Sequence, residues 1–183
     1  MVQTQCLCAQ APSVVTRARF VVIRHHKEDL RGSNTARIAR LALPNLEMHS
    51  YGGPGEFVEP GVLARPNMWL LFPDENGPRI VTERPDFVVV LDGTWSQARK
   101  MMQRIPGIRG MPRLALPTPA LAPLRLRQQP TMKEGMSTME AMAGAVALLE
   151  GAENAEPLYR FHDAFVRSVL TQRGSIRTGV APR

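Results

Sequence analysis

Apolar residues gather in short runs along the chain, and each run is bounded by polar residues, glycine or proline. The clearest run ends at Asp92 and is apolar at consecutive positions, which is typical of a strand buried on both faces of a parallel sheet. Short β-branched runs between turn residues favour strands, so we expect a strand at each of them. They are Arg19–His26, Asn67–Pro73, Asp86–Asp92 and Pro112–Pro117.

Between these runs the apolar residues recur at helical spacing, with capping residues at the helix starts. Thr94 and Gln97 form one capping box, and Ser137 and Glu140 form a second. Asn34 is a further N-cap candidate. The predicted helices are Asn34–Leu43, Thr94–Arg104, Ser137–Gly151 and Leu158–Leu170.

Strands that alternate with helices predict the α/β class, with a mostly parallel sheet flanked by helices. The 183 residues fit a single domain. Residues 1–16 are a short N-terminal segment, residues 171–183 are a basic tail that we expect to fray, and Tyr51–Phe57 is a glycine-rich loop. The proline-punctuated stretch Pro117–Pro130 is not expected to form a regular element.

Ligands of parallel sheets bind outside the carboxyl ends of the strands. Asp92, Phe72–Pro73 and Leu116–Pro117 stand at such ends, so Asp92 is a candidate functional carboxylate. The competing interpretation, that Asp92 caps the next helix, is weakened because Thr94 can cap it instead. The helix start at Ser137 is a candidate anion site, although simple capping would select the same residues.

Charge points toward nucleic acid as a partner. The net charge is +7, and all but three of the 23 basic residues are arginine, whose planar fork suits phosphate. No acidic residue occurs from Gly93 to Lys133, a span that contains Arg99, Lys100 and Arg104. We interpret this span as a track for a phosphate backbone; the alternative is an ordinary solvated basic face.

Apolar run lengths, cysteines and histidines limit the membrane and metal partners that the sequence allows. No apolar run approaches the roughly 18 residues needed to cross a membrane, and no signal peptide is visible, so we expect a cytoplasmic protein without a membrane partner. Cys6 and Cys8 supply only half of a closed zinc site. If the first strand continues, His25 and His26 point to opposite faces of the sheet.

The segment Asp92–Trp95, D-G-T-W, resembles the D-x-T-W signature of the DTW-domain family of tRNA-uridine aminocarboxypropyltransferases. Four further segments resemble blocks of that family in the same order, from about Cys6 to Gly151. They are the C-L-C at Cys6–Cys8, His25–Ala39 with its N-T-A-R, Leu70–Pro73, and Gly135–Ala143.

The resemblance implies a SPOUT-like α/β core with a knot, and two substrates, S-adenosylmethionine and tRNA. The 3-amino-3-carboxypropyl group would move to N3 of a uridine, which releases 5′-methylthioadenosine. Asp92 would then be the general base, with Thr94 and Trp95 beside it in the catalytic signature. The strand-end loops and one helix start would bind the donor through Leu71, Phe72, Pro73, Leu91, Gly93, Leu116, Pro117, Ser137, Thr138 and Glu140.

The same resemblance makes Asn34 and Arg37 candidates for RNA contact, beside Arg99, Lys100 and Arg104 from the charge pattern. Family members often carry an earlier C-x-x-C that would complete a zinc site. The sequence shows no such pair, so no metal is expected, and Cys6 and Cys8 are the residues that would hold one. Methyl transfer to RNA from the same donor, or RNA binding without catalysis, are the alternatives.

Overall fold

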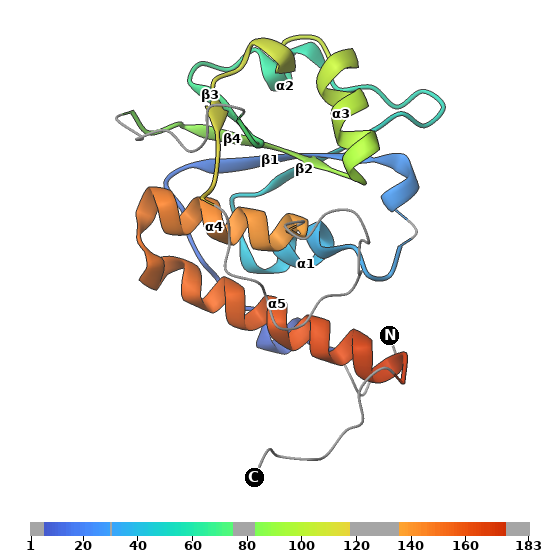
Figure 1. Cartoon of the computed structure of the whole chain (residues 1–183), viewed down its shortest axis with the longest axis vertical. Helices are drawn as coiled ribbons and strands as arrows, with labels where there is room; N and C mark the ends of the chain where they lie inside the picture. The colour runs from blue at the N-terminus through green and yellow to red at the C-terminus, as the bar shows by residue number, and fades with distance from the viewer. Residues whose placement is uncertain (1–5, 30, 75–82, 118–135, 175–183) are drawn as a thin grey trace.

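The computed structural model describes residues 6–29, 31–74, 83–117 and 136–174. The predicted α/β class is confirmed, because five parallel strands form one sheet with helices on both faces (Figure 1). The strand order is β2-β1-β4-β3-β5. The strands are β1 (Arg19–His25), β2 (Glu47–Tyr51), β3 (Met68–Leu71), β4 (Phe87–Asp92) and β5 (Arg113–Leu114).

The helices form layers above and below this sheet. In Figure 1, α2 (Pro60–Leu63) and α3 (Trp95–Arg104) lie above it, and α1 (Thr35–Ala42) and α4 (Thr138–Glu150) lie below. Helix α5 (Ala152–Gln172) packs against α1 and α4 as the outermost layer. Short 3-10 turns complete the described secondary structure: η2 (Cys8–Gln10), η3 (His26–Glu28) and η4 (Ile108–Gly110).

Each central strand sends alternate side chains into two separate cores. On β4, Val88 and Val90 face the α1, α4 and α5 core, whereas Val89 and Leu91 face the α3 core. All four are buried, as the uninterrupted apolar run predicted. Full burial of one such side chain contributes about 1.5–3 kcal/mol, so β4 anchors both helical layers.

The chain leaves β1 and β4 toward opposite faces of the sheet. These two strands are neighbours, with Arg24 in register with Asp92. After β1 the chain enters η3 and α1 below the sheet, and after β4 it enters α3 above (Figure 1). Such a divergence is the topological switch point at which open parallel sheets bind ligands.

Some boundaries differ from the predictions. Strand β1 ends at His25, because His26 already begins η3. The last helix starts at Ala152 rather than Leu158 and runs to Gln172, past the predicted start of the fraying tail. Pro157 lies inside this helix, where it removes one backbone hydrogen bond without ending the helix.

Besides the 3-10 turns, one strand and one α-helix were not predicted. Strand β2 is polar and half-buried at the sheet edge, and Tyr51, expected in a loop, is its last residue. Helix α2 is only four residues long. Most of Pro117–Pro130 and residues 175–183 lie outside the described residues. The knot stays a prediction, because residues 118–135, which connect β5 to α4, lie outside them too.

Candidate active site

Asp92 ends β4 at the switch point, and its side chain is buried at 4% exposure. It accepts a hydrogen bond from the Asn34 amide at 2.7 Å on one oxygen and from the Thr138 hydroxyl at 2.6 Å on the other. The carboxylate therefore joins β4 to the N-cap of α1 and the first residue of α4.

Asn34 is held in one orientation by its cap. Its Oδ1 accepts the backbone amide of Arg37 at 3.0 Å, so its Nδ2 is the group that faces Asp92. Thr138 is the first residue of α4. The starts of two helices thus point toward one carboxylate, and the positive ends of both helix dipoles favour its negative charge.

Burial raises the pKa of Asp92, and the hydrogen bonds from Asn34 and Thr138 oppose that rise. The nearby Glu28 carboxylate raises the pKa further, while Arg24 lowers it. A carboxylate with a raised pKa is a stronger base than a free aspartate. Perturbed carboxylates of this kind are frequent at catalytic sites.

A cavity of about 150 Å³ opens beside Asp92, at the carboxyl ends of β3, β4 and β5. The Asp92 neighbours Leu91 and Gly93 line it. Of the predicted donor-binding residues, Leu71, Phe72, Pro73, Leu91, Gly93, Leu116, Ser137 and Thr138 line the cavity, as does Trp95. The lining also includes Val90, Ala98, Leu114, Met136 and Ala141, which the sequence reasoning missed.

Two of the missed residues carried a signal in the sequence. Ala141 follows Thr138 by one helical turn, and Leu114 ends β5 as Leu71 ends β3. Pro117 and Glu140 were also predicted to bind the donor. Pro117 is exposed, and Glu140 turns its carboxylate back to the amide of Ser137 at 2.7 Å.

The aromatic wall of the cavity is fixed by neighbouring side chains. The rings of Phe72 and Trp95 meet edge to face at 5.7 Å. The Arg113 guanidinium lies 5.9 Å from the Phe72 ring centroid and donates to the Pro73 carbonyl at 3.0 Å. These contacts hold the loop after β3 against α3 and β5.

Both predicted capping boxes are confirmed. The Thr94 hydroxyl accepts the Gln97 amide at 3.3 Å, which places that hydroxyl in the cap of α3. The Ser137 hydroxyl accepts the Glu140 amide at 3.2 Å and lies 2.9 Å from Nε2 of the buried His162. The cap of α4 therefore uses most of its own polar groups, and the Met139 amide, outside the capping box, donates to the Thr35 hydroxyl at 3.4 Å.

Of the residues predicted to contact RNA, four are exposed and one is buried. Arg99, Lys100 and Arg104 are exposed on α3, and none of them forms an ion pair within the described residues. Arg37 is exposed on α1. Asn34 is buried against Asp92, so its side chain is not available at the surface.

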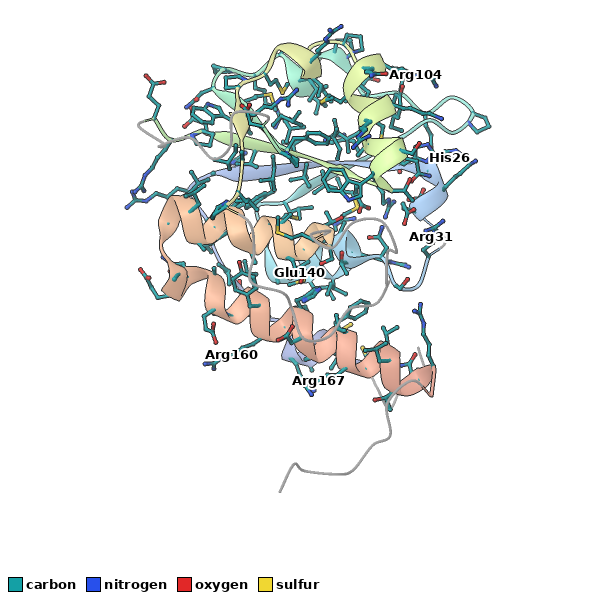
Figure 2. The ribbon with its side chains drawn as sticks, viewed as in Figure 1. His26, Arg31, Arg104, Glu140, Arg160 and Arg167 are labelled. Carbon is teal, nitrogen blue, oxygen red and sulfur yellow. The ribbon has the colours of Figure 1, made fainter. Side chains whose placement is uncertain are left out.

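Figure 2 shows where the labelled basic residues lie. Arg104 and His26 are on the side of the molecule at which β1 and β4 end, whereas Arg160 and Arg167 project from α5, far from that side. Arg160 is also paired with Glu156, at 2.7 Å. Arg104 of α3 thus shares that side of the molecule with His26, whereas Arg160 and Arg167 do not.

Metal and membrane features are limited in the described part of the chain. Cys6 and Cys8 are exposed free thiols, and no cluster of three or more potential ligands forms among the described residues. Within the same ranges, none of the helices combines the length and the hydrophobicity that a bilayer crossing requires.

Together, the fold and the site define an α/β protein with a mainly apolar ligand cavity and a buried carboxylate at the switch point of a parallel sheet. The profile of the DTW domain matches residues 1–170, and the chain belongs to this family. The DTW-type segment thus begins at the last residue of β4.

One curated relative is the tRNA-uridine aminocarboxypropyltransferase 2 of Drosophila melanogaster. It is 26% identical over 156 residues, which cover 79% of this chain and 61% of that protein. The chain therefore spans about three fifths of the length of this relative. No solved structure gives a significant match.

Proposed function

We propose that this protein transfers the 3-amino-3-carboxypropyl group of S-adenosylmethionine to N3 of a uridine in tRNA. The observation that carries the proposal is the position of the D-G-T-W segment. In a DTW-family chain, it puts a buried carboxylate with a raised pKa and a cavity-lining tryptophan together at the switch point. The Drosophila relative is named for this reaction.

The cavity suits the donor chemically. Its lining is mainly aliphatic, from Leu71, Leu91, Leu114 and Leu116, with the Phe72 and Trp95 rings at one side. Such surfaces bind an adenine ring and the carbon groups around the sulfur, and no charged side chain lines the cavity within the described residues. The Asp92 carboxylate just beyond the lining would favour the positive sulfonium.

In the reaction, a C–N bond forms between uridine N3 and the γ-carbon of the methionine moiety. The C–S bond breaks, its electron pair stays on sulfur, and 5′-methylthioadenosine leaves. Uridine N3 must first lose its proton, and we assign Asp92 as the base that takes it. Both carboxylate oxygens already accept one protein hydrogen bond, so the imide must share an oxygen with Asn34 or Thr138.

The test is mass spectrometry of both products after incubation with S-adenosylmethionine and unmodified tRNA. Asp92→Asn is compared with Asp86→Asn, an exposed aspartate just before the first residue of the same strand. Loss of a general base costs about 10²–10⁴ in rate, so Asp92→Asn should lose the modified uridine while Asp86→Asn keeps it. Full activity in Asp92→Asn would exclude the assigned base.

The released small molecule separates the alternatives. S-adenosylhomocysteine with a methylated base would mean that the donor binds in another pose and the protein is a methyltransferase. Neither product, with tRNA affinity intact in the wild type and in Asp92→Asn, would mean that the chain binds RNA without catalysis.

A further inference from the structure

Two histidines stand side by side where β1 ends, on the opposite side of Gly93 from the cavity residues of β3 and β5. The His25 and His26 rings are 4.7 Å apart and tilted by 31°. A strand that continued through His26 would point the two rings to opposite faces, but the strand stops at His25 and the turn into η3 brings the rings together. Both side chains are partly exposed.

The hydrogen bonds of His25 fix which ring nitrogen carries the hydrogen. Its Nδ1 accepts the backbone amide of Lys27 at 3.3 Å. Burial lowers the pKa of His25, and the adjacent His26 and Lys27 lower it further, which favours the neutral ring at neutral pH. A neutral imidazole that accepts at Nδ1 carries its hydrogen on Nε2. His25 therefore presents a hydrogen-bond donor and has no free acceptor.

One glycine lies next to Nε2 of His25, and a second lies next to its Cβ. A Cβ on Gly52 would lie 3.8 Å from His25 Nε2 and 3.6 Å from His26 Cδ2. Gly52 also has φ +91°, a conformation that other residues rarely adopt. A Cβ on Gly93 would lie 3.6 Å from His25 Cβ. His25 is thus next to Gly93, which itself lines the cavity.

The position of His25 meets the needs of the second substrate. The crevice at a switch point lies between the two diverging strands, here the ends of β1 and β4. The cavity occupies the β4, β3 and β5 side of this crevice, which leaves the β1 side for the group that accepts the transfer. Loss of the N3 proton spreads negative charge onto the two carbonyl oxygens of uracil, and a fixed N–H donor stabilises such an anion.

We propose that His25 Nε2–H donates a hydrogen bond to a uracil carbonyl next to N3, with His26 as a stacked wall for the base. This inference rests on the proposed function. It adds where the target uracil binds and which side chain donates a hydrogen bond to it. His25 would hold no proton destined for transfer; it would bind the base and stabilise its anion.

The first experiment measures kcat and KM for tRNA in His25→Phe and His25→Gln, with His49→Phe as a control histidine on the neighbouring strand β2. Removal of one oxyanion donor costs about 10²–10³ in kcat, so His25→Phe should lose that factor. Glutamine can still donate a hydrogen bond, so the kcat of His25→Gln should be at least about tenfold higher than that of His25→Phe. The affinity for S-adenosylmethionine and the melting temperature should not fall in parallel with kcat across these variants.

Equal losses in the Phe and Gln variants, or no loss in either, would overturn the donor role while the wild-type product still supports the transferase. The second experiment does not need activity. It follows the His25 ring resonance by NMR, assigned by its loss in His25→Gln, as uridine or cytidine 5′-monophosphate is added with 5′-methylthioadenosine present.

A shift that uridine monophosphate produces at lower concentration than cytidine monophosphate supports the base site, even if the wild type makes no modified uridine and the proposed function fails. Equal shifts would indicate phosphate binding only and overturn the inference, as would no shift with either nucleotide.

Discussion

Replacing Thr138 with valine tests whether Asp92 is an ionised, paired carboxylate. The change keeps the shape of the side chain but removes the hydroxyl that donates to Asp92 Oδ1 at 2.6 Å. A hydrogen bond to a charged group contributes about 1.5–3 kcal/mol. For a domain of this length, such a loss lowers the melting temperature by about 3–12 °C near neutral pH.

The same variant makes a prediction about pH. Burial raises the pKa of Asp92, and the Thr138 hydroxyl opposes the rise, so its removal raises that pKa further. A group whose folded pKa lies above its unfolded value destabilises the fold as the pH rises through the folded pKa. The cost of Thr138→Val must therefore shrink toward the roughly 0.5–1.5 kcal/mol of a neutral hydrogen bond once Asp92 is protonated.

The assay is urea unfolding at about pH 7.5 and at several lower values through the acid range. The control is Thr35→Val at the same helix junction. Its hydroxyl accepts the Met139 amide at 3.4 Å, so its cost should be about 0.5–1.5 kcal/mol and independent of pH. An equal cost of Thr138→Val at every pH, or none at pH 7.5, would refute the ionised, paired Asp92.

Three further predictions follow from the described contacts. Asn34→Ala should lower the free energy of unfolding by more than the roughly 0.5–2 kcal/mol of a lost N-cap, because it also leaves an Asp92 oxygen unpaired. Urea unfolding of this variant and of the double variant Asn34→Ala, Asp92→Asn separates the two contributions. The folded pKa of His25 is lowered, so its share of the stability is present above its ordinary pKa of 6.5 and is lost as the pH falls through the folded value; His25→Gln should flatten this slope of unfolding free energy against pH. Arg104→Ala should lower the slope of log affinity for tRNA against log salt by about 0.7–0.9, whereas Arg160→Ala, on the far helix α5, should leave it unchanged.

Local signals in the sequence predicted much of the fold. The run before Asp92 is a strand buried on both faces, and both capping boxes start helices where predicted. These features depend on neighbours within four residues, which a single sequence displays. The position of Asp92 at a strand end followed from the same local pattern.

Features set by distant contacts could not be predicted in this way. Among the described strands, β2 pairs with β1 alone and stays half-buried, so it lacks the apolar run that identified the other strands. The partners of Asp92 come from Asn34, 58 residues before it, and Thr138, 46 residues after it. The last helix was predicted to start at Leu158, but α5 begins at Ala152, continues through Pro157 and packs against α4.

The D-G-T-W segment connects both helical layers to the sheet, and each of its four residues has a different role. Asp92 ties α1 and α4 below the sheet, while Thr94 caps α3 above it. Gly93 leaves room for the Gln97 side chain of that cap, and Trp95 lines the cavity. Substitutions at these four residues should therefore have different effects on activity and stability. Loss of Asp92 should act on catalysis and on a pH-dependent part of stability, and loss of Thr94 on α3 alone. A side chain at Gly93 should crowd the Gln97 side chain, which its Cβ would approach to 3.1 Å, and only touch His25, at 3.6 Å. Loss of Trp95 should weaken donor binding. If all four variants instead lost stability and activity in proportion, the segment would be a structural hinge and not a catalytic one.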